Sequence, residues 1–222
     1  MDIMTAIKER HSVRDYTDKV IEVETAEKLR EKIEKLNERS GLNMQIMLNE
    51  KGGFGNFVVK YGLIKNVKNY IAVVGKKGEN LDETAGYYGE ELVIYAQRLG
   101  LNTCWVGVPF IRDKCACEIG KDEKLVCVIA IGYGANQGFQ HKNKPFEKLC
   151  KVDGQMPDWF KAGVECAMMA PTAMNQQKFL FELVDENMVS AKALAGPFSK
   201  VDLGIVKYHF EIGAGKDNFL WK

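Results

Sequence analysis

The sequence has very little net charge. Its 31 Lys and Arg residues nearly balance its 30 Asp and Glu residues, which leaves a formal net charge of +1. This balance favours neither nucleic acid nor an anionic membrane as a partner. No apolar run approaches the roughly 18 residues that a membrane-spanning helix needs, and the first residues lack the basic and apolar regions of a signal peptide. We therefore expect a cytoplasmic protein with no nucleic-acid and no membrane partner.

Cysteine is also sparse, with six residues among 222. This density is too low for a small disulfide-stabilised scaffold. Cys115 and Cys117 form the only close pair, and a structural zinc site needs a second pair of ligands at similar spacing. We therefore expect reduced, mostly buried thiols and no metal. The Gly-x-Ser-x-Gly run of many serine hydrolases is missing as well, so a hydrolase has no support.

What the sequence does contain is a pattern of helices between short apolar strands. With 46% hydrophobic residues the chain can bury a substantial core, and such alternation indicates an α/β layered domain. No Pro/Ser-rich linker interrupts it, so we expect one domain over residues 1–222. Helices are expected over 22–39, 84–99 and from Asp158, and strands over 44–48, 70–74, 103–108, 125–131 and 179–184.

Parts of this pattern repeat weakly along the chain. The expected helix–turn–strand unit at 158–184 echoes the one at 23–48, and residues 204–221 echo residues 89–105. Either the chain has two similar halves or the similarity arises by chance. A glycine-rich loop lies between two of the strands, at 51–56, and the nearby Phe54 and Tyr61 can either roof a pocket or pack in the core.

A basic run directly follows the first short helix, which Asp2 can cap. Arg10, His11, Ser12 and Arg14 combine two guanidinium groups with an imidazole and a hydroxyl. A phosphate needs positive charge and several directional donors, and arginine supplies a planar fork of them. The alternative is a solvated basic turn.

A second run near the other end of the chain forms a polar turn. It consists of Pro171, Thr172, Ala173, Met174, Asn175 and Gln176. Its small side chains are expected to leave backbone groups accessible, and the Asn175 amide can donate and accept at once, which suits the pyrimidine edge of a flavin. The alternative is an ordinary helix-to-strand turn.

Two further segments can contribute to the same site. Lys142 and Lys144 can reinforce a phosphate site or belong to a solvated surface loop. The strand segment Trp105, Val106 and Gly107 can lie along a flat ring, with the glycine admitting close backbone approach, or it can be a plain core strand. A competing signal is the glycine turn at 132–138, which loosely resembles a dinucleotide-binding turn. That reading requires a helix to begin directly afterwards.

Together these runs resemble the nitroreductase family of flavoenzymes. The family has an Arg-Arg/His-Ser-x-Arg start, matched by residues 10–14, and an Ala-Pro-Ser-Ala-x-Asn-x-Gln turn, matched by residues 170–177. A Leu-Gly-Leu helix end and a Cys-Trp-x-Gly strand match 99–101 and 104–107. In the usual member the second motif lies shortly after the first. Here it lies near the C-terminus, which resembles a rearranged subgroup.

The resemblance implies an α+β, nitroreductase-like fold, with a central mixed or antiparallel sheet flanked by helices and two similar halves. It also implies a homodimer that binds FMN at its interface. Residues 10, 11, 12 and 14 would hold the phosphate and ribityl chain, with Lys142 and Lys144 adding charge. Residues 171–176 would contact the ring, from the same chain or from the partner chain, and Val106 and Gly107 would offer backbone groups to its other edge.

The expected activity is an FMN-dependent NAD(P)H oxidoreductase, with NADH or NADPH as co-substrate. A small-molecule electron acceptor, such as a nitroaromatic or a quinone, would take the reducing equivalents. The flavin carries the chemistry, so no side chain is expected to be a catalytic nucleophile or acid. Two alternatives stay open at this point: a non-catalytic FMN-binding protein for storage or sensing, and a dinucleotide-binding dehydrogenase without flavin.

Overall fold

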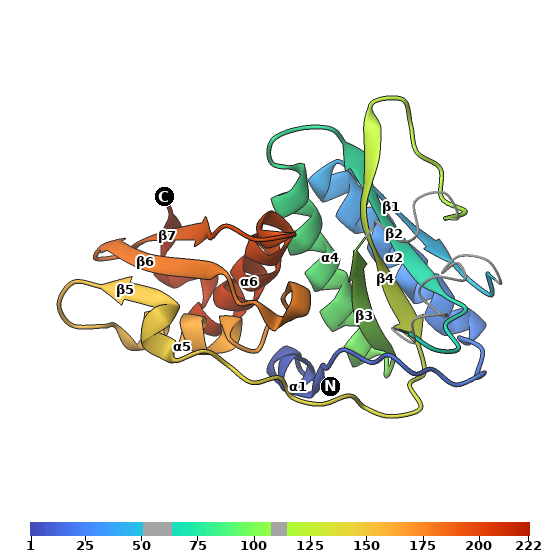
Figure 1. The fold of residues 1–222 in the computed structure, drawn as a ribbon, viewed down its shortest axis with the longest axis horizontal. Coiled ribbons are helices and arrows are strands. Elements are labelled where there is room, and N and C mark those ends of the chain that lie inside the picture. Colours follow the sequence, from blue (N-terminus) through green and yellow to red (C-terminus); the bar gives the residue numbers. More distant parts are fainter. Residues whose placement is uncertain (51–63, 108–114) are drawn as a thin grey trace. The chain divides into compact units, whose positions relative to one another are not determined.

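The computed structural model describes residues 1–50, 64–107 and 115–222 (Figure 1). The expected loop at 51–56, together with Phe54 and Tyr61, lies outside the described residues, as does Val108 at the end of an expected strand.

The chain divides into two compact units, called unit 1 and unit 2 from here on. Unit 1 comprises residues 1–81 and 91–139, and unit 2 comprises residues 82–90 and 140–222. Helix α4 (Leu81–Arg98) contributes residues to both. The single domain expected over residues 1–222 stays a prediction.

Unit 1 is built on a four-stranded antiparallel sheet with the order β1-β2-β4-β3. The strands are β1 (Leu42–Met47), β2 (Tyr70–Lys76), β3 (Asn102–Gly107) and β4 (Glu123–Gly132). The two central strands are buried along almost their whole length, which explains their continuous apolar sequence. β2 continues one residue past Gly75, to Lys76, and β4 ends at Gly132.

The helices of unit 1 follow the expected periodicity. Asp2 caps α1 (Ile3–Glu9) by accepting from the Thr5 N–H at 3.0 Å. The buried stripe of α2 (Val23–Ser40) consists of Ala26, Leu29, Ile33 and Leu36. Val23, expected in that stripe, is 75% exposed because it stands at the first turn. Gly41 ends α2 with φ +70°, as predicted.

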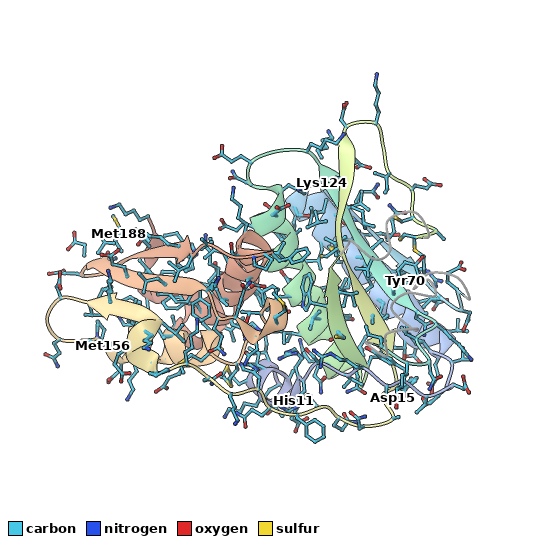
Figure 2. All side chains as sticks on the ribbon, in the orientation of Figure 1. His11, Asp15, Tyr70, Lys124, Met156 and Met188 are labelled. Atoms are coloured by element: carbon cyan, nitrogen blue, oxygen red, sulfur yellow. The ribbon has the colours of Figure 1, made fainter. Side chains whose placement is uncertain are left out.

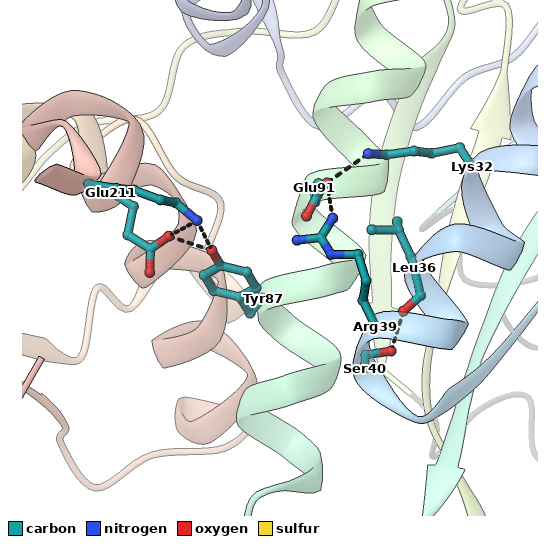
Figure 3. A network of polar contacts seen from close by, with 8 residues as sticks. Lys32, Leu36, Arg39, Ser40, Tyr87, Glu91 and Glu211 are labelled. Atoms are coloured by element: carbon teal, nitrogen blue, oxygen red, sulfur yellow. Dashed lines mark hydrogen bonds and ion pairs between the residues drawn. The ribbon is translucent and has the colours of Figure 1, made fainter.

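Charged side chains tie the helices of unit 1 together. Glu91 of α4 accepts from Lys32 at 2.7 Å and from Arg39 at 3.1 Å, both on α2 (Figure 3). The Glu91 side chain is only 12% exposed, so two cations on α2 balance a carboxylate that is mostly removed from water.

Unit 2 contains a second four-stranded sheet, of mixed direction, in the order β5-β6-β7-β8. The strands are β5 (Cys150–Val152), β6 (Phe179–Asp185), β7 (Met188–Ala193) and β8 (Leu220–Trp221). β6 and β7 are antiparallel, whereas the outer pairs are parallel. The helices are α5 (Asp158–Ala167) and α6 (Ser199–Ala214), with short 3₁₀ turns η2 (Phe146–Lys148), η3 (Ala173–Asn175) and η4 (Lys216–Asn218).

An aromatic cluster forms the core of unit 2 around Phe210 of α6. Its ring stacks on Phe181 with centroids 4.6 Å apart and meets Phe160 and Phe219 edge-on. Glu211, the next residue, accepts from Trp221 Nε1 at 2.8 Å and from the Tyr87 hydroxyl of α4 (Figure 3). Apolar and polar contacts therefore both fix the C-terminal half of helix α6.

Glycines allow the backbone of helix α6 to approach the backbones of α4 and α5 closely where the helices cross. A Cβ atom on Gly204 would lie 1.9 Å from the Glu83 carbonyl oxygen of α4, and one on Gly86 would lie 2.0 Å from the Val201 carbonyl oxygen. A Cβ on Gly213 would meet the Ala162 carbonyl oxygen of α5 at 2.5 Å. No side chain fits at these contacts, so the two helices of each pair approach through their backbones.

The α+β class is thus confirmed, with the strands divided between two sheets instead of one central sheet. Helices at 22–39, 84–99 and 158 onward and all five expected strands are present within a few residues. Asp158 was expected as a cap, but it is the first helical residue and Pro157 takes the cap position. No described helix combines the length and apolar character that crossing a membrane requires.

Candidate functional site

The basic run lies along the outer edge of β3 in unit 1. Ser12 forms a parallel bridge with Thr103, and the Val13 N–H donates to the Thr103 carbonyl at 3.0 Å. Val13 is fully buried. Because alternate residues of an extended segment face opposite ways, anchoring Val13 in the core turns its neighbours outward. The run is therefore an edge segment anchored at Ser12 and Val13, and its role in phosphate binding stays a prediction.

The two arginines of this run have different surroundings. Arg10 ends α1 and is only 4% exposed, whereas Arg14 is exposed and its Nη1 approaches the Ser12 carbonyl at 3.5 Å. His11, labelled in Figure 2, lies between them and is half-buried. Burial and the neighbouring Arg10 charge lower the pKa of His11, so the neutral imidazole, which can both donate and accept, is favoured at neutral pH.

The glycine turn at 132–138 wraps around the basic run. Asn102 links two positions of this turn. Its Oδ1 accepts from the Gly134 N–H and its Nδ2 donates to Gln137 Oε1, each at 2.9 Å. A Cβ on Gly138 would lie 2.8 Å from His11 Cβ. Residues 135–145 form no helix, so the dinucleotide-binding interpretation is wrong. The glycines instead let the turn approach the basic run closely.

Alternate residues of β3 direct their backbone groups away from the sheet, at its outer edge. Since the Thr103 carbonyl points away from β4, the alternation of a strand places the Trp105 and Gly107 N–H and C=O groups on that same outer side. The backbone groups of Val106 point to β4. Trp105 therefore lies beside Gly107 on the outer side, and the expected contact of Val106 with a ring stays a prediction.

The polar turn of unit 2 is strongly bent. Met174, Asn175 and Gln177 all have positive φ values, of 52°, 52° and 43°, a region that non-glycine residues seldom occupy outside functional sites. Met174 is 81% exposed. Gln177, whose side chain was not among the expected site residues, is buried and organises the turn: its Nε2 donates to Asn175 Oδ1 at 2.8 Å.

The basic segment of unit 2 packs against this turn. Both Asn175 Nδ2 and Gln177 Nε2 donate to the Lys142 carbonyl at 2.8 Å. Lys144 bonds to Gln177 twice, through its N–H to Oε1 and through Nζ to the carbonyl, each at 2.9 Å. The structure therefore brings Lys142 and Lys144 together with the turn, and their expected contribution to the phosphate site stays a prediction. The Lys144 ammonium group holds a turn carbonyl.

Backbone donors of the turn are less available than expected. The Asn175 and Gln176 N–H groups donate to carbonyls of Thr172 and Ala173. The Ala173 N–H donates to Asp202 Oδ1 at 2.9 Å. The expectation of accessible backbone donors was wrong for these three groups. The Asn175 amide keeps one N–H and one lone pair beyond its bonds within the turn.

Asp202 of α6 is a second residue that no sequence motif indicated. It is 2% exposed and accepts from Ala173 N–H and from Gln176 Nε2, the latter at 2.7 Å. Burial raises the pKa of Asp202 to about 6, although its two hydrogen bonds oppose this. The carboxyl group holds both ends of the η3 turn, so the turn depends on α6 for its shape.

Stability should therefore depend on the protonation of Asp202. The ordinary pKa of its carboxyl group is 3.8, and the fold raises that pKa to about 6, so the fold favours the protonated carboxyl. This stabilisation is complete below pH 3.8 and is lost as pH rises through 6. At about 1.4 kcal/mol per pKa unit, we expect the wild-type free energy of unfolding, relative to Asp202→Asn, to fall by roughly 2–3 kcal/mol between pH 4 and pH 7. Urea titrations at both pH values measure it, and an unchanged difference would contradict it.

The predicted site residues therefore fall into two organised sets. Unit 1 brings together residues 10–14, the glycine turn and the outer edge of β3. Unit 2 brings together Lys142, Lys144 and residues 171–177, with Asp202 beneath them. Among residues 1–50, 64–107 and 115–222, no group of three or more His, Cys, Asp or Glu side chains is arranged to hold a metal ion.

Known proteins resemble this chain over nearly its whole length. The family model described as "Putative TM nitroreductase" matches residues 2–214. A solved structure from Thermotoga maritima, described as a "putative nitroreductase", shares 22% identity with a TM-score of 0.69, and the match covers 98% of this chain and 85% of that one. Among curated proteins, none matches this chain.

Two further solved structures are described as complexes with FMN. A nitroreductase-like protein from Desulfovibrio desulfuricans, in complex with FMN, has 19% identity and a TM-score of 0.54, covering 71% of this chain and 99% of its own. A similar complex from Exiguobacterium sibiricum has 16% identity and a TM-score of 0.52, covering 67% and 95%. At these identities the likeness shows a shared fold.

Proposed function

This chain belongs to the TM1586-type nitroreductase family, and from that premise we propose that it is an FMN-dependent oxidoreductase. In this proposal NADH or NADPH supplies the electrons, and a nitroaromatic, quinone or related small molecule accepts them. The observation that carries the proposal is the basic run fixed along the outer edge of β3, where Ser12 bridges Thr103. Two solved structures with this fold are described as complexes with FMN, which supports the choice of cofactor.

The donors of unit 1 suit the phosphate end of FMN. Arg14 is exposed, and Ser12 and His11 are half-buried on the same short segment, so a guanidinium, a hydroxyl and an imidazole are available within a few residues. Arg10, buried at the end of α1, adds a charge that water screens poorly. We propose that these groups bind the phosphate and the ribityl hydroxyls, while the outward N–H groups of Trp105 and Gly107 face the ring.

The turn of unit 2 suits a planar ring. Met174 is exposed on a strained backbone, and the Asn175 amide retains one donor and one acceptor. We propose that residues 171–176 contact the ring and that Lys142 adds positive charge nearby. When bound, FMN supplies reversible two-electron chemistry, taking up hydride from a reduced nicotinamide and delivering it to an acceptor. The chain positions these reactants and holds the local charge.

A spectrum of the purified protein tests this proposal first. We expect flavin absorbance, or its appearance after FMN is added and excess removed, and a bound mass equal to FMN. Anaerobic addition of NADH or NADPH should bleach that absorbance, and a quinone should restore it. A protein that takes up no FMN overturns the proposal. A protein that binds FMN but is never bleached supports the alternative, a storage or sensor protein.

Arg14 provides the sharpest test of the phosphate contact. Because a hydrogen bond to a charged group contributes about 1.5–3 kcal/mol, we expect Arg14→Ala to weaken FMN binding roughly 10- to 100-fold in a fluorescence titration. Its exposed side chain predicts an unchanged melting temperature. Arg30→Ala, at an exposed position on α2, removes the same charge and should bind FMN as the wild type does. Equal binding by both variants would exclude a phosphate role for Arg14.

Three broader features belong to the proposal as well: a cytoplasmic location, a homodimer, and membership of the rearranged subgroup with its Ala-Pro-Thr turn near the C-terminus. In that arrangement the partner chain can supply one wall of the flavin site. Sedimentation of the FMN-loaded protein tests the homodimer, and a monomer at micromolar concentration would argue against it.

A further inference from the structure

Two of the six cysteines differ from the rest in exposure and spacing. Cys115 and Cys117 are partly exposed, whereas the others are buried: Cys104, Cys127, Cys150 and Cys166. Both side chains of the pair pack against the same apolar cluster, on the face of the unit 1 sheet that carries Tyr70. Residues two apart in an extended segment share a face, so this spacing places the two thiols side by side.

A hydrogen bond from the residue between the two cysteines holds the pair in this position. Tyr70, labelled in Figure 2, is fully buried on β2, and its hydroxyl accepts from the Ala116 N–H at 2.9 Å. The residue between the two cysteines is therefore anchored to the core of the sheet.

A second anchor follows directly after the pair. The Gln45 amide of β1 accepts from the Glu118 N–H at 2.9 Å and donates to the Glu118 carbonyl at 2.7 Å. With Tyr70 on one side and Gln45 on the other, the segment is fixed to two neighbouring strands. Two thiols fixed two residues apart against the same apolar cluster have a high effective concentration toward each other.

We propose that Cys115 and Cys117 form a redox-active dithiol, which a hydroperoxide converts to an intramolecular disulfide. One sulfur takes an oxygen atom from the peroxide and becomes a sulfenic acid, with release of water or an alcohol. The other sulfur then attacks it, forming the S–S bond and releasing the hydroxyl group with the thiol proton as a second water. A small thiol such as dithiothreitol returns both groups to the reduced state.

Both thiols are partly exposed, so either sulfur can take the oxygen atom first, and the other then closes the disulfide. Neither step involves the proposed flavin site, so the dithiol can be tested in protein with or without FMN.

Peroxide treatment followed by alkylation and peptide mass measurement tests the proposal. We expect the peptide with both cysteines to lose two hydrogens and to escape alkylation, and dithiothreitol should restore both thiols. The four buried cysteines serve as internal controls and should be alkylated after unfolding. Two alkylatable thiols after peroxide, a linkage between two chains, or oxygen addition without linkage would each overturn the proposal.

Single variants test whether both sulfurs are needed. Cys115→Ser and Cys117→Ser should each stop at the sulfenic acid of the remaining cysteine, which dimedone labels, and neither should form the intramolecular disulfide. Circular dichroism confirms that both variants are folded. Absence of dimedone labelling in both variants, or wild-type protein that is labelled as strongly as the variants, would overturn the proposal.

Discussion

Replacing Gly204 by alanine is expected to destabilise the protein far more than the addition of one methyl group usually does. The new Cβ would lie 1.9 Å from the Glu83 carbonyl oxygen and 2.6 Å from the Tyr87 backbone nitrogen. Both atoms belong to the backbone of α4, which cannot turn aside as a flexible side chain does. The crossing must open, and that loosens the contacts α6 makes on either side of it.

The expected size follows from two opposing effects. Overpacking a core typically costs about 1–3 kcal/mol and occasionally more, and a backbone clash lies at the upper end. The helix propensity of alanine returns only about 1 kcal/mol. We therefore expect a net loss of at least roughly 2 kcal/mol, which for a chain of this size lowers the melting temperature by about 4–8 °C, measured by calorimetry.

A matched glycine provides the control for this result. At Gly78, ahead of α4, the nearest atom to an added Cβ is 4.0 Å away and φ is ordinary. We expect Gly78→Ala to change stability by less than about 0.5 kcal/mol. Gly86→Ala, on the other side of the same crossing, should behave as Gly204→Ala does. A Gly204→Ala protein that melts with the wild type would mean that the two helices are not packed this closely.

Local sequence patterns revealed the helices of this fold but not the contacts that its glycines make. Periodicity predicted α2 and α4, because an amphipathic stripe is a local property. Gly75 lies one residue before the end of β2 and Gly132 is the last residue of β4, and both pair within the sheet of unit 1. A Cβ on Gly75 would meet Leu42 and Leu81 side chains at 2.8 and 2.6 Å, and one on Gly132 would meet Tyr16 at 3.1 Å. These two glycines leave room for side chains that are distant in the sequence. No local sequence pattern reveals such contacts.

The candidate site divides in the same way. The basic run and the Ala-Pro turn were predictable because each is a contiguous motif. Gln177 and Asp202 were not, although they hold the turn in shape. Asp202 lies in the first turn of α6. An acidic residue there usually lies at the surface and interacts favourably with the helix dipole. Its burial and its bond to Ala173 arise only from the folding of residues 29 positions apart.

Two short strands also escaped prediction for a physical reason. β5 has three residues and β8 has two, so neither is long enough to establish a period. β7 pairs with β6 through the tight turn at Glu186 and Asn187, and it carries a polar residue, Ser190, at a buried position. Their existence depends on the edges that β6 and β7 provide.

The second large effect is expected from the buried pair His209 and Glu90 in unit 2. Both side chains are 0% exposed, and His209 Nε2 lies 2.8 Å from Glu90 Oε1. His209 Nδ1 faces the Cys166 carbonyl at 3.3 Å, which can only accept, so Nδ1 carries a hydrogen.

Removing one member takes this hydrogen bond from the other, which stays buried. Breaking a buried pair in this way typically costs about 3–5 kcal/mol, so we expect His209→Leu and Glu90→Met each to lose that much in urea unfolding. The double variant replaces the pair with apolar side chains, a change that is often neutral. It should therefore be more stable than either single variant.

An exposed pair supplies the comparison that isolates burial as the cause. Lys161 and Glu165 lie 3.9 Å apart on α5, with side chains 59% and 57% exposed, and such pairs contribute at most about 1 kcal/mol. Lys161→Ala should therefore barely shift the unfolding midpoint. If the His209 and Glu90 losses instead add in the double variant, the two groups stabilise unit 2 independently. A double variant that is more stable than either single variant would show that leaving one polar group behind in the core is what makes the single changes costly.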